Sequence, residues 1–357
     1  MKAVVINKFV QNYAEVHVSE IPVPSPNNDE ILIHVKAAGV NFVDTLYSRG
    51  LHQNNRRHVT PPFTLGLEFA GEVISAPASC SFPPGCRVFG ACLGAYAEYL
   101  ALPASNATAL HHMPPAWSYR QAASLGATLP VSYGALKLRG ALKSGETVLV
   151  HSAAGGLGLA AVQLARALGC RVIGTAGSTL KCAIAERFGA EKCINYTANT
   201  KWWEEVNRLT GQKGVDIVFD SVGLVSDSLR CLVHRGRLLV MGFAGREGNL
   251  EAVKMNRVLL SQAIIIGYVS IQLPLLSPQK LRFGESERRD PAESVQIWTE
   301  LLPLIEAGQI KPAVYAGKYQ GLESVPTALE DIAARRVWGK AVIQISTADD
   351  QSERAQL

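Results

Sequence analysis

The stretch TVLVHSAAGGLGLAAVQLARALGCRVIG, residues Thr147 to Gly174, decides the fold of this chain. Its first five residues are apolar and β-prone, as is typical of a buried parallel strand, and the small-residue turn Ser152 to Gly158 follows directly. A helix is predicted next, because apolar residues recur on one helical face at Ala161, Leu164, Ala165 and Leu168. Gly169 is placed to end that helix in a left-handed conformation, and Arg171 begins a second strand.

The turn in this stretch has the spacing of a dinucleotide-binding site. Ala153, Gly155 and Gly158 occupy the three fixed positions of G-x-G-x-x-G, with alanine at the first. Small residues there allow backbone amides to approach a pyrophosphate at the positive end of the helix dipole. The predicted contacts are the residues of the turn itself: Ala153, Ala154, Gly155, Gly156, Leu157 and Gly158. An ordinary glycine-rich turn between strand and helix is the alternative.

Length and composition indicate a two-domain enzyme. The 357 residues are 48% hydrophobic, which supplies enough apolar side chains for roughly two cores. The net charge of +5 is modest and dispersed, so nucleic-acid binding has little support. No apolar run is long enough to span a membrane, and the N-terminus shows no signal-peptide pattern, so we expect a cytoplasmic protein. The seven cysteines include no C-x-x-C pair and are expected to be reduced thiols.

The chain changes character near residue 128. Residues 1–127 show short alternating strands punctuated by Gly and Pro, which predicts an antiparallel, barrel-like domain. Residues 128–305 alternate strands with amphipathic helices, which predicts a doubly wound parallel sheet of six strands and hence an α/β fold. Residues 306–357 end in a strand that we expect to return to the first domain and close its barrel.

Three local predictions in the second half bear on later results. Leu180, Ile184 and Phe188 recur at i, i+4 and i+8 and predict a helix, closed by Gly189. A further helix is expected over Val225 to Val233, followed by a strand over Arg237 to Met241. The polar segment Ser277 to Pro291 is expected to be an exposed loop or insertion.

The end of the second strand indicates which nucleotide is bound. An NAD-selective site places Asp or Glu about twenty residues beyond the turn, but the chain there reads Gly174-Thr175-Ala176-Gly177-Ser178, and the next carboxylate is Glu186. Lys181 lies nearby, and a cation about 4 Å from a phosphate gains on the order of 4 kcal/mol before solvent screening. We therefore predict NADP(H), with Ser178 and Lys181 at the 2′-phosphate. A solvated lysine at a helix start is the alternative for Lys181.

Several separated motifs, in order along the chain, resemble one family. They are SAAGGLGLAAVQLARALG, GVNFVDTLYSRG from Gly39, LEFAGEV from Leu67 and the closing RRVWGKAVI. Together they are similar to the quinone oxidoreductase branch of the medium-chain dehydrogenase/reductase superfamily, the zeta-crystallin relatives. The resemblance implies a GroES-like domain, built from residues 1–127 and 306–357, and a Rossmann NADP-binding domain, residues 128–305.

The resemblance also bears on metal binding. Alcohol dehydrogenases of the superfamily have a cysteine at the position of Asn41, a histidine within the segment Gly66-Leu67-Glu68, and a third ligand near Thr128. Amide, alkyl and hydroxyl groups are poor zinc ligands, so no metal is expected. Without a Lewis acid, hydride transfer to an electron-poor quinone or enone is favoured over alcohol oxidation.

The resemblance implies the remaining site residues. Catalytic candidates lie near the nicotinamide pocket: Asn41, Asp44, Tyr47, His52 and Ser132. Asp44 can equally be a structural turn carboxylate, and His52 a solvated side chain. Further cofactor contacts are expected at the ends of the strands and from the tail: Gly174, Thr175, Tyr196, Ser221, Gly242, Phe243, Ala244, Gly267, Tyr268 and Arg335. Arg336 is an alternative to Arg335, Tyr196 can instead pack on a helix, and the glycines can be simple turn residues.

The predicted function is therefore NADPH-dependent reduction of quinones or α,β-unsaturated carbonyls without a metal. Two alternatives stay open: an enoyl thioester reductase of the same superfamily, and a non-catalytic NADPH-binding protein of the crystallin or RNA-binding kind. The resemblance also implies a homodimer joined through the edges of the Rossmann sheets.

Overall fold

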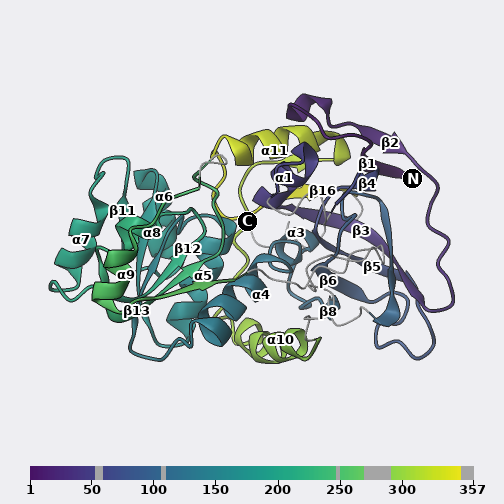
Figure 1. The fold of residues 1–357 in the computed structure, drawn as a ribbon. Helices are drawn as coiled ribbons and strands as arrows, with labels where there is room; N and C mark the ends of the chain where they lie inside the picture. Colours follow the sequence, from purple (N-terminus) through teal and green to yellow (C-terminus); the bar gives the residue numbers. More distant parts are fainter. Residues whose placement is uncertain (53–58, 106–109, 247–249, 269–290, 347–357) are drawn as a thin grey trace. The chain divides into compact units, whose positions relative to one another are not determined.

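The computed structural model describes residues 1–52, 59–105, 110–246, 250–268 and 291–346. The chain folds into two compact units. Unit 1 takes its described residues from Met1–Ala127, Ile271–Gln296 and Pro312–Leu357, and unit 2 takes them from Thr128–Ser270 and Ile297–Lys311. Figure 1 shows the two units as ribbons.

Unit 2 is built on a parallel sheet in the strand order of a dinucleotide-binding fold. The order is β11-β10-β9-β12-β13-β14, so the first strand lies at the centre and the chain reverses direction across the sheet between β9 and β12. The strands are β9 (Thr147–Val150), β10 (Arg171–Ala176), β11 (Lys192–Asn195), β12 (Val215–Asp220), β13 (Leu232–Val240) and β14 (Ile264–Gly267). The predicted six-stranded sheet and α/β class are confirmed.

Helices cover this sheet (Figure 1). Helix α5 packs on β9 and β10, α6 on β10 and β11, and α8 and α9 on β13. The predicted apolar face of α5 is buried at Ala161, Leu164 and Ala165, and Gly169 ends the helix with a φ of 78°. The described helical segments of unit 2 are α4 (Thr128–Tyr133), η3 (Gly134–Arg139), α5 (Gly156–Ala167), α6 (Thr179–Arg187), α7 (Trp202–Leu209), α8 (Val225–Ser228), α9 (Met255–Ser261) and the later part of α10 (Pro291–Glu306).

Of two local helix predictions in unit 2, one is confirmed and one is wrong. The helix predicted from the spacing of Leu180, Ile184 and Phe188 is α6, which buries Cys182 and Ala185 and leaves Leu180 67% exposed. The helix expected over Val225 to Val233 is the single turn α8, since β13 already begins at Leu232 and pairs there with β12. The segment expected to be an exposed loop at 277–291 lies outside the described residues except for its last residue, with which α10 begins.

Unit 1 is mainly antiparallel β structure. A seven-stranded sheet holds the path β15-β16-β3-β5-β6-β8 with β7 beside β3, and a three-stranded sheet runs β2-β1-β4. The tail strand β16 pairs antiparallel with β3, Ala341 opposite Val40. The strands are β1 (Lys2–Ile6), β2 (Val18–Glu20), β3 (Glu30–Val40), β4 (Phe63–Thr64), β5 (Glu68–Ser75), β6 (Arg87–Ala91), β7 (Tyr99–Pro103), β8 (Leu110–His112), β15 (Tyr319–Gln320) and β16 (Ala341–Gln344).

Short helices flank the sheets of unit 1. Helix α1 follows β3 directly and contacts α11, so the segment after β3 and the tail share one core. The described helical segments are η1 (Tyr13–Glu15), α1 (Phe42–Arg49), α3 (Tyr119–Ala122), η4 (Leu322–Ser324), α11 (Val325–Ala333) and the start of α10. The direct step from β3 into α1 places Asn41 and Asp44 at the end of a buried strand.

Candidate functional site

The turn after β9 is shaped as an anion-binding loop. Gly155 lies at the N-cap of α5, and Ser152 adopts a φ of 51° to start the turn. The amide of Ala153 donates to the carbonyl oxygen of Thr175 at 2.9 Å, which fixes the turn to the end of β10. Because the first N–H groups of an α-helix have no intrahelical acceptor, the start of α5 offers donors and a positive dipole end to a phosphate.

The glycines of this turn are required by close packing. A β-carbon on Gly158 would overlap the carbonyl oxygen of Ser152 and would lie 2.8 Å from the α-carbon of Ala153. A β-carbon on Gly174 would lie 2.7 Å from the β-carbon of Ala153. Gly158 and Gly174 therefore let helix, turn and second strand meet closely, which is the role of the third fingerprint position.

The region after β10 gathers three of the predicted cofactor contacts. Ser178 is the N-cap of α6, and its hydroxyl oxygen accepts from the amide of Lys181 at 3.2 Å. The ring of Tyr196 lies over Gly177, since a β-carbon there would lie 2.7 Å from the tyrosine hydroxyl. Ser178 and Lys181 follow the end of β10, and Tyr196 follows the end of its neighbour β11. The segment between Gly174 and Ser178 carries no carboxylate.

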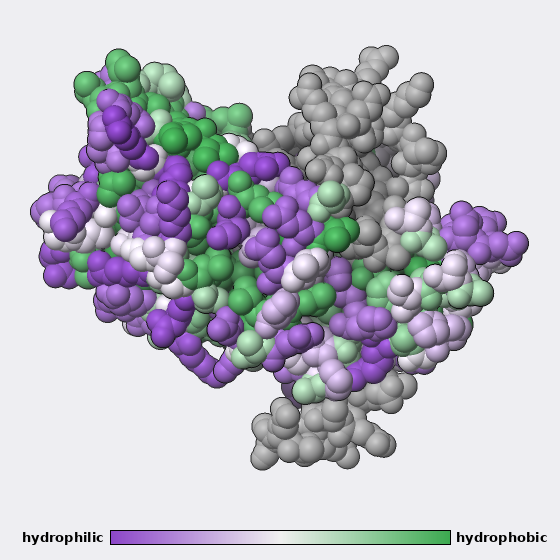
Figure 2. Space-filling model, turned by 90° about the horizontal axis from the view of Figure 1, so that it is seen from below, coloured by the Kyte–Doolittle hydropathy of each residue, from purple (hydrophilic) through white to green (hydrophobic). Residues whose placement is uncertain are grey.

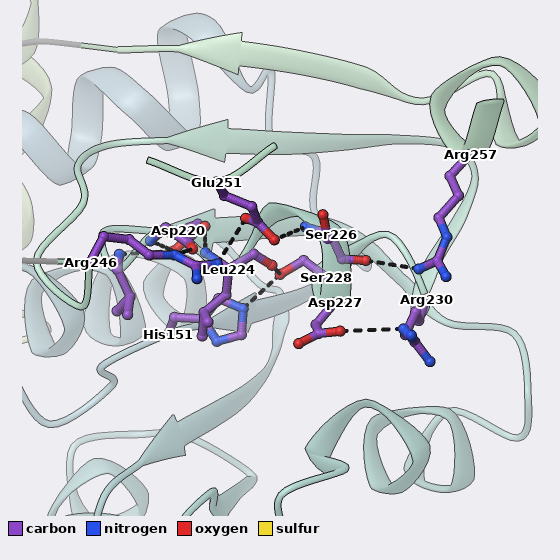
Figure 3. A network of polar contacts seen from close by, with 12 residues as sticks. His151, Asp220, Leu224, Ser226, Asp227, Ser228, Arg230, Arg246, Glu251 and Arg257 are labelled. Atoms are coloured by element: carbon purple, nitrogen blue, oxygen red, sulfur yellow. Dashed lines mark hydrogen bonds and ion pairs between the residues drawn. The ribbon is translucent and has the colours of Figure 1, made fainter. Parts of the chain in front are cut away.

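The strand ends of β12 and β13 are tied together by a network that the sequence patterns did not single out (Figure 3). The Asp220 carboxylate accepts three backbone N–H groups, from residues 222, 223 and 224, at 2.6–2.9 Å. Arg246 donates to the carbonyl oxygen of Gly223 at 2.5 Å and forms an ion pair with Glu251 at 3.1 Å. An aspartate at the end of a buried strand is the signal that could have indicated the first of these contacts.

This network positions the predicted contacts at the two strand ends. The amide of Ala244 donates to the carbonyl oxygen of Ser221 at 3.2 Å, so the loops after β12 and β13 touch. Among the described atoms, a β-carbon on Gly242 would have only that same Ser221 oxygen within 4 Å, at 3.5 Å, and Phe243 lies beside Gly223. Ser221, Gly242, Phe243 and Ala244 therefore form one continuous rim of unit 2.

Three other predicted residues of unit 2 differ in their packing. Ser132 is buried and donates its hydroxyl to the carbonyl oxygen of Leu157 at 3.1 Å, so its proton is used within the unit. Tyr268 is buried against Gly134, where a β-carbon would overlap its hydroxyl. Gly267 is open, because a β-carbon there would have no described atom within 4 Å.

Unit 1 contains a buried polar cluster around Asn41. The Asn41 side-chain amide accepts a hydrogen bond from Lys340 Nζ at 2.5 Å and donates one to Glu68 Oε2 at 3.2 Å. Lys340 and Glu68 form an ion pair at 2.5 Å, with side chains only 4% and 0% exposed. Glu68 also accepts from the amide of Ala127 at 2.8 Å. Both ends of the Asn41 amide are therefore held, so its orientation is fixed.

Asp44 lies next to this cluster and is fully buried. Its Oδ2 accepts from the amide of Asn41 at 2.8 Å and from the Tyr96 hydroxyl at 2.6 Å, whereas its Oδ1 has no hydrogen-bond partner among the described residues. Burial raises the pKa of Asp44 to about 7, although both hydrogen bonds and the Lys340 cation act to lower it. Burial therefore makes the carboxylic acid form more accessible at Asp44 than at a solvated aspartate.

The remaining predicted residues of unit 1 lie on or near α1 and the tail. Tyr47 is buried on α1, and its ring lies 4.9 Å from that of the half-buried His52. Arg335 is exposed and has a φ of 58°, and the neighbouring Arg336 is bound to Asp331 at 2.6 Å. Both arginines follow α11, and both stay candidates for the cofactor contact of the tail.

Metal binding is not favoured by the donor atoms present. The positions expected to hold ligands in metal-using relatives carry the Asn41 amide, engaged by Lys340, and the buried alkyl side chain of Leu67. Across the described part of the chain, no cluster of three or more His, Cys, Asp or Glu side chains is arranged to hold a metal ion.

Among the helices that the structure describes, none has the length and hydropathy needed to cross a bilayer.

Comparisons with known proteins agree with this architecture. Residues 27–114 match the family described as alcohol dehydrogenase GroES-like domain, and residues 156–280 match the family described as zinc-binding dehydrogenase. The chain is 33% identical over 319 residues to quinone oxidoreductase of Homo sapiens, covering 88% of each protein. It is 32% identical over 354 residues to prostaglandin reductase-3 of Bos taurus, covering 97% of this chain and 89% of the relative.

A solved structure is similar over nearly the whole chain. The Escherichia coli quinone oxidoreductase complexed with NADPH superposes with a TM-score of 0.79 at 29% identity, covering 96% of this chain and all of the other. The GroES-like and Rossmann parts of the predicted fold are therefore both matched by known proteins.

Proposed function

Because the chain belongs to the quinone oxidoreductase branch of the medium-chain dehydrogenase/reductase superfamily, we propose that it reduces quinones or α,β-unsaturated carbonyl compounds with NADPH, by hydride transfer and without a metal. The observation that carries this proposal is the Asn41 amide, held at both ends by Lys340 and Glu68 where metal-using relatives have a cysteine. A site with that donor set lacks a Lewis acid to polarise an alcohol. An acceptor that is already electron-poor needs less assistance.

Unit 2 is proposed to hold the cofactor. The amides at the start of α5 bind the pyrophosphate, and Ser178 and Lys181 bind the 2′-phosphate, with Tyr196 beside the adenine-side phosphate. The packing requirement at Gly158 supports this assignment, because it keeps the turn close to the helix start. When bound, NADPH supplies the hydride, and the protein supplies orientation.

Unit 1 is proposed to act on the acceptor. Asn41 offers an amide in a fixed orientation, and Asp44, with a pKa raised to about 7 by burial, can hold or release a proton at neutral pH. Tyr47 and His52 are proposed to donate a hydrogen bond to the oxygen that gains charge as the acceptor is reduced. The relative named prostaglandin reductase-3 supports a reductase whose acceptors are not limited to quinones.

The test is NADPH oxidation by the purified protein with three acceptors: 1,2-naphthoquinone, a simple enone and a crotonyl thioester. Turnover of the first two supports the proposal. Preference for the thioester would favour an enoyl thioester reductase, and tight NADPH binding without oxidation by any acceptor would indicate a non-catalytic protein.

The choice of nucleotide is tested at Lys181. Titration of NADPH and NADH into the wild type and Lys181→Ala should show a preference for NADPH that falls roughly tenfold or more in the variant, because one charged contact to the 2′-phosphate is lost. Lys201→Ala, at an exposed lysine of the same unit, is the control. Unchanged preference in Lys181→Ala would contradict the assignment.

A homodimer is proposed through the β14 edge. Among the described residues, β14 pairs only with β13, and large hydrophobic side chains on α9 and β14 are exposed, including Leu259 at 76%, Leu260 at 77% and Ile264 at 50%. Figure 2 shows hydrophobic side chains gathered at the upper left of the face seen from below, whereas most of that face is mixed. An open strand edge beside apolar side chains suits pairing with a second copy.

A further inference from the structure

A buried histidine directly precedes the phosphate turn of unit 2. His151 follows β9, is 0% exposed, and packs edge-on against Trp202. Its Nδ1 lies 2.9 Å from Thr175 Oγ1. Its Nε2 lies 2.9 Å from Ser228 Oγ, a contact that Figure 3 draws. The side chain therefore connects the end of β9 with the end of β10 and with α8.

Counting protons fixes the state of this ring. Ser228 has one hydroxyl proton, and it is donated to the carbonyl oxygen of Leu224 at 2.6 Å. His151 Nε2 must therefore donate to Ser228. Burial lowers the pKa of His151, so the ring is neutral and Nδ1 carries no proton. Thr175 must then donate its hydroxyl proton to Nδ1.

The same residues hold the base of the turn through their backbones. The amide of His151 donates to the carbonyl oxygen of Phe219 at 3.0 Å, and the amide of Ala153 donates to the carbonyl oxygen of Thr175 at 2.9 Å. Thr175 is thus bonded on two sides, by its hydroxyl to His151 and by its carbonyl to the turn. Its hydroxyl proton is used and cannot also be donated to a cofactor.

We propose that His151, as the neutral Nε2–H tautomer, is a positioning residue that holds the phosphate turn against β10 and α8 through Thr175 and Ser228. This role rests on the proposed binding of NADPH by unit 2. It acts through the turn, without contact between the imidazole and the nucleotide. Thr175 contributes through the same connection, by position and without a hydrogen bond to the cofactor.

The tautomer is tested first, on the wild-type protein without cofactor. Long-range ¹H–¹⁵N spectra of histidine-labelled protein at pH 7, with His151→Gln used to assign the signal, should show a protonated Nε2 and an unprotonated Nδ1 for His151. An Nδ1–H tautomer or an imidazolium would overturn the proposal, whatever the protein binds.

The positioning role is tested by NADPH dissociation constants of folded variants. His151→Gln and Thr175→Val should each weaken NADPH binding roughly tenfold, because each leaves a buried polar partner unsatisfied, while Thr175→Ser should retain near wild-type affinity. His234→Gln, at an exposed histidine of the same unit, is the control and should bind as the wild type does.

The outcomes separate this proposal from the function. Affinity within twofold of wild type for both His151→Gln and Thr175→Val would overturn the positioning role. If His151→Gln does not fold, Thr175→Val decides alone, because valine preserves the shape of threonine. If the wild type fails to bind NADPH, the proposed function fails, and the NMR result still reports on the tautomer.

Discussion

Removing one partner of the Lys340–Glu68 ion pair should destabilise unit 1 strongly. The two side chains are 4% and 0% exposed, and Nζ and Oε2 lie 2.5 Å apart. Lys340→Met leaves Glu68 as an uncompensated buried carboxylate, and loss of one member of such a pair typically costs about 3–5 kcal/mol. The Asn41 amide also loses the donor that fixes its carbonyl oxygen.

The structure offers a matched control for this effect. Lys2 and Glu323, also in unit 1, form an ion pair of nearly the same length, 2.6 Å, but with side chains 51% and 58% exposed. Water screens an exposed pair, so Lys2→Met should leave stability nearly unchanged. The comparison varies burial while holding the chemistry and the distance almost constant.

Urea denaturation of the Lys340→Met, Glu68→Gln and double variants measures the coupling. The double variant should lose less free energy of unfolding than the two single losses together, by about 2 kcal/mol or more, because the isolated buried charge is absent. NADPH oxidation assays should show a fall in kcat for Lys340→Met with little change in NADPH affinity. The variant releases the Asn41 side-chain amide of unit 1, whereas NADPH is proposed to bind unit 2. A Lys340→Met loss no larger than that of Lys2→Met would refute the reasoning.

Three further predictions concern the turn, pH and assembly. Gly158→Ala should destabilise the protein by about 1–3 kcal/mol and weaken NADPH binding, because the added methyl overlaps the Ser152 carbonyl; thermal unfolding with and without NADPH measures both, and an unchanged NADPH stabilisation would contradict the role of the turn. Burial lowers the pKa of His111 from 6.5 to about 3, so the unfolded chain takes up a proton below pH 6.5 that the folded protein does not. Between pH 7 and 5, the free energy of unfolding of the wild type should fall by about 2 kcal/mol more than that of His111→Phe. Urea denaturation at the two pH values measures this, and an equal fall in both proteins would exclude it. Ile264→Lys should convert a dimer to a monomer in light scattering, whereas an unchanged mass would remove β14 as the interface.

The sequence predicted those features of the fold that depend on local pattern. The strand, turn and helix around Ser152 to Gly158 follow from residues adjacent in the chain, and the parallel arrangement of the sheet follows from the alternation of strands with helical crossovers. The pattern failed where tertiary contacts decide. The helix expected at Val225 stops after one turn because β13 takes its later residues into the sheet.

The candidate site was predictable to the same extent. Gly158, Ser178 and Lys181 were found because a phosphate turn and a helix start have local signatures, and their contacts with a cofactor stay predictions. Lys340 was not found, because it is 299 positions from Asn41 and no local pattern connects them. The division into domains at residues 127 and 306 likewise stays a prediction.

The pairing of the tail explains how such a distant lysine reaches the site. In the antiparallel register of β16 with β3, Ala341 is opposite Val40, so Lys340 comes opposite Asn41, the residue that follows β3. Side chains alternate between the two faces of a strand, and a slip of one residue would turn Lys340 away and leave the Glu68 carboxylate buried without a cation. The need to neutralise Glu68 therefore favours this register over its neighbours. The ion pair that fixes the Asn41 amide is, by this reasoning, also what sets the position of the closing strand.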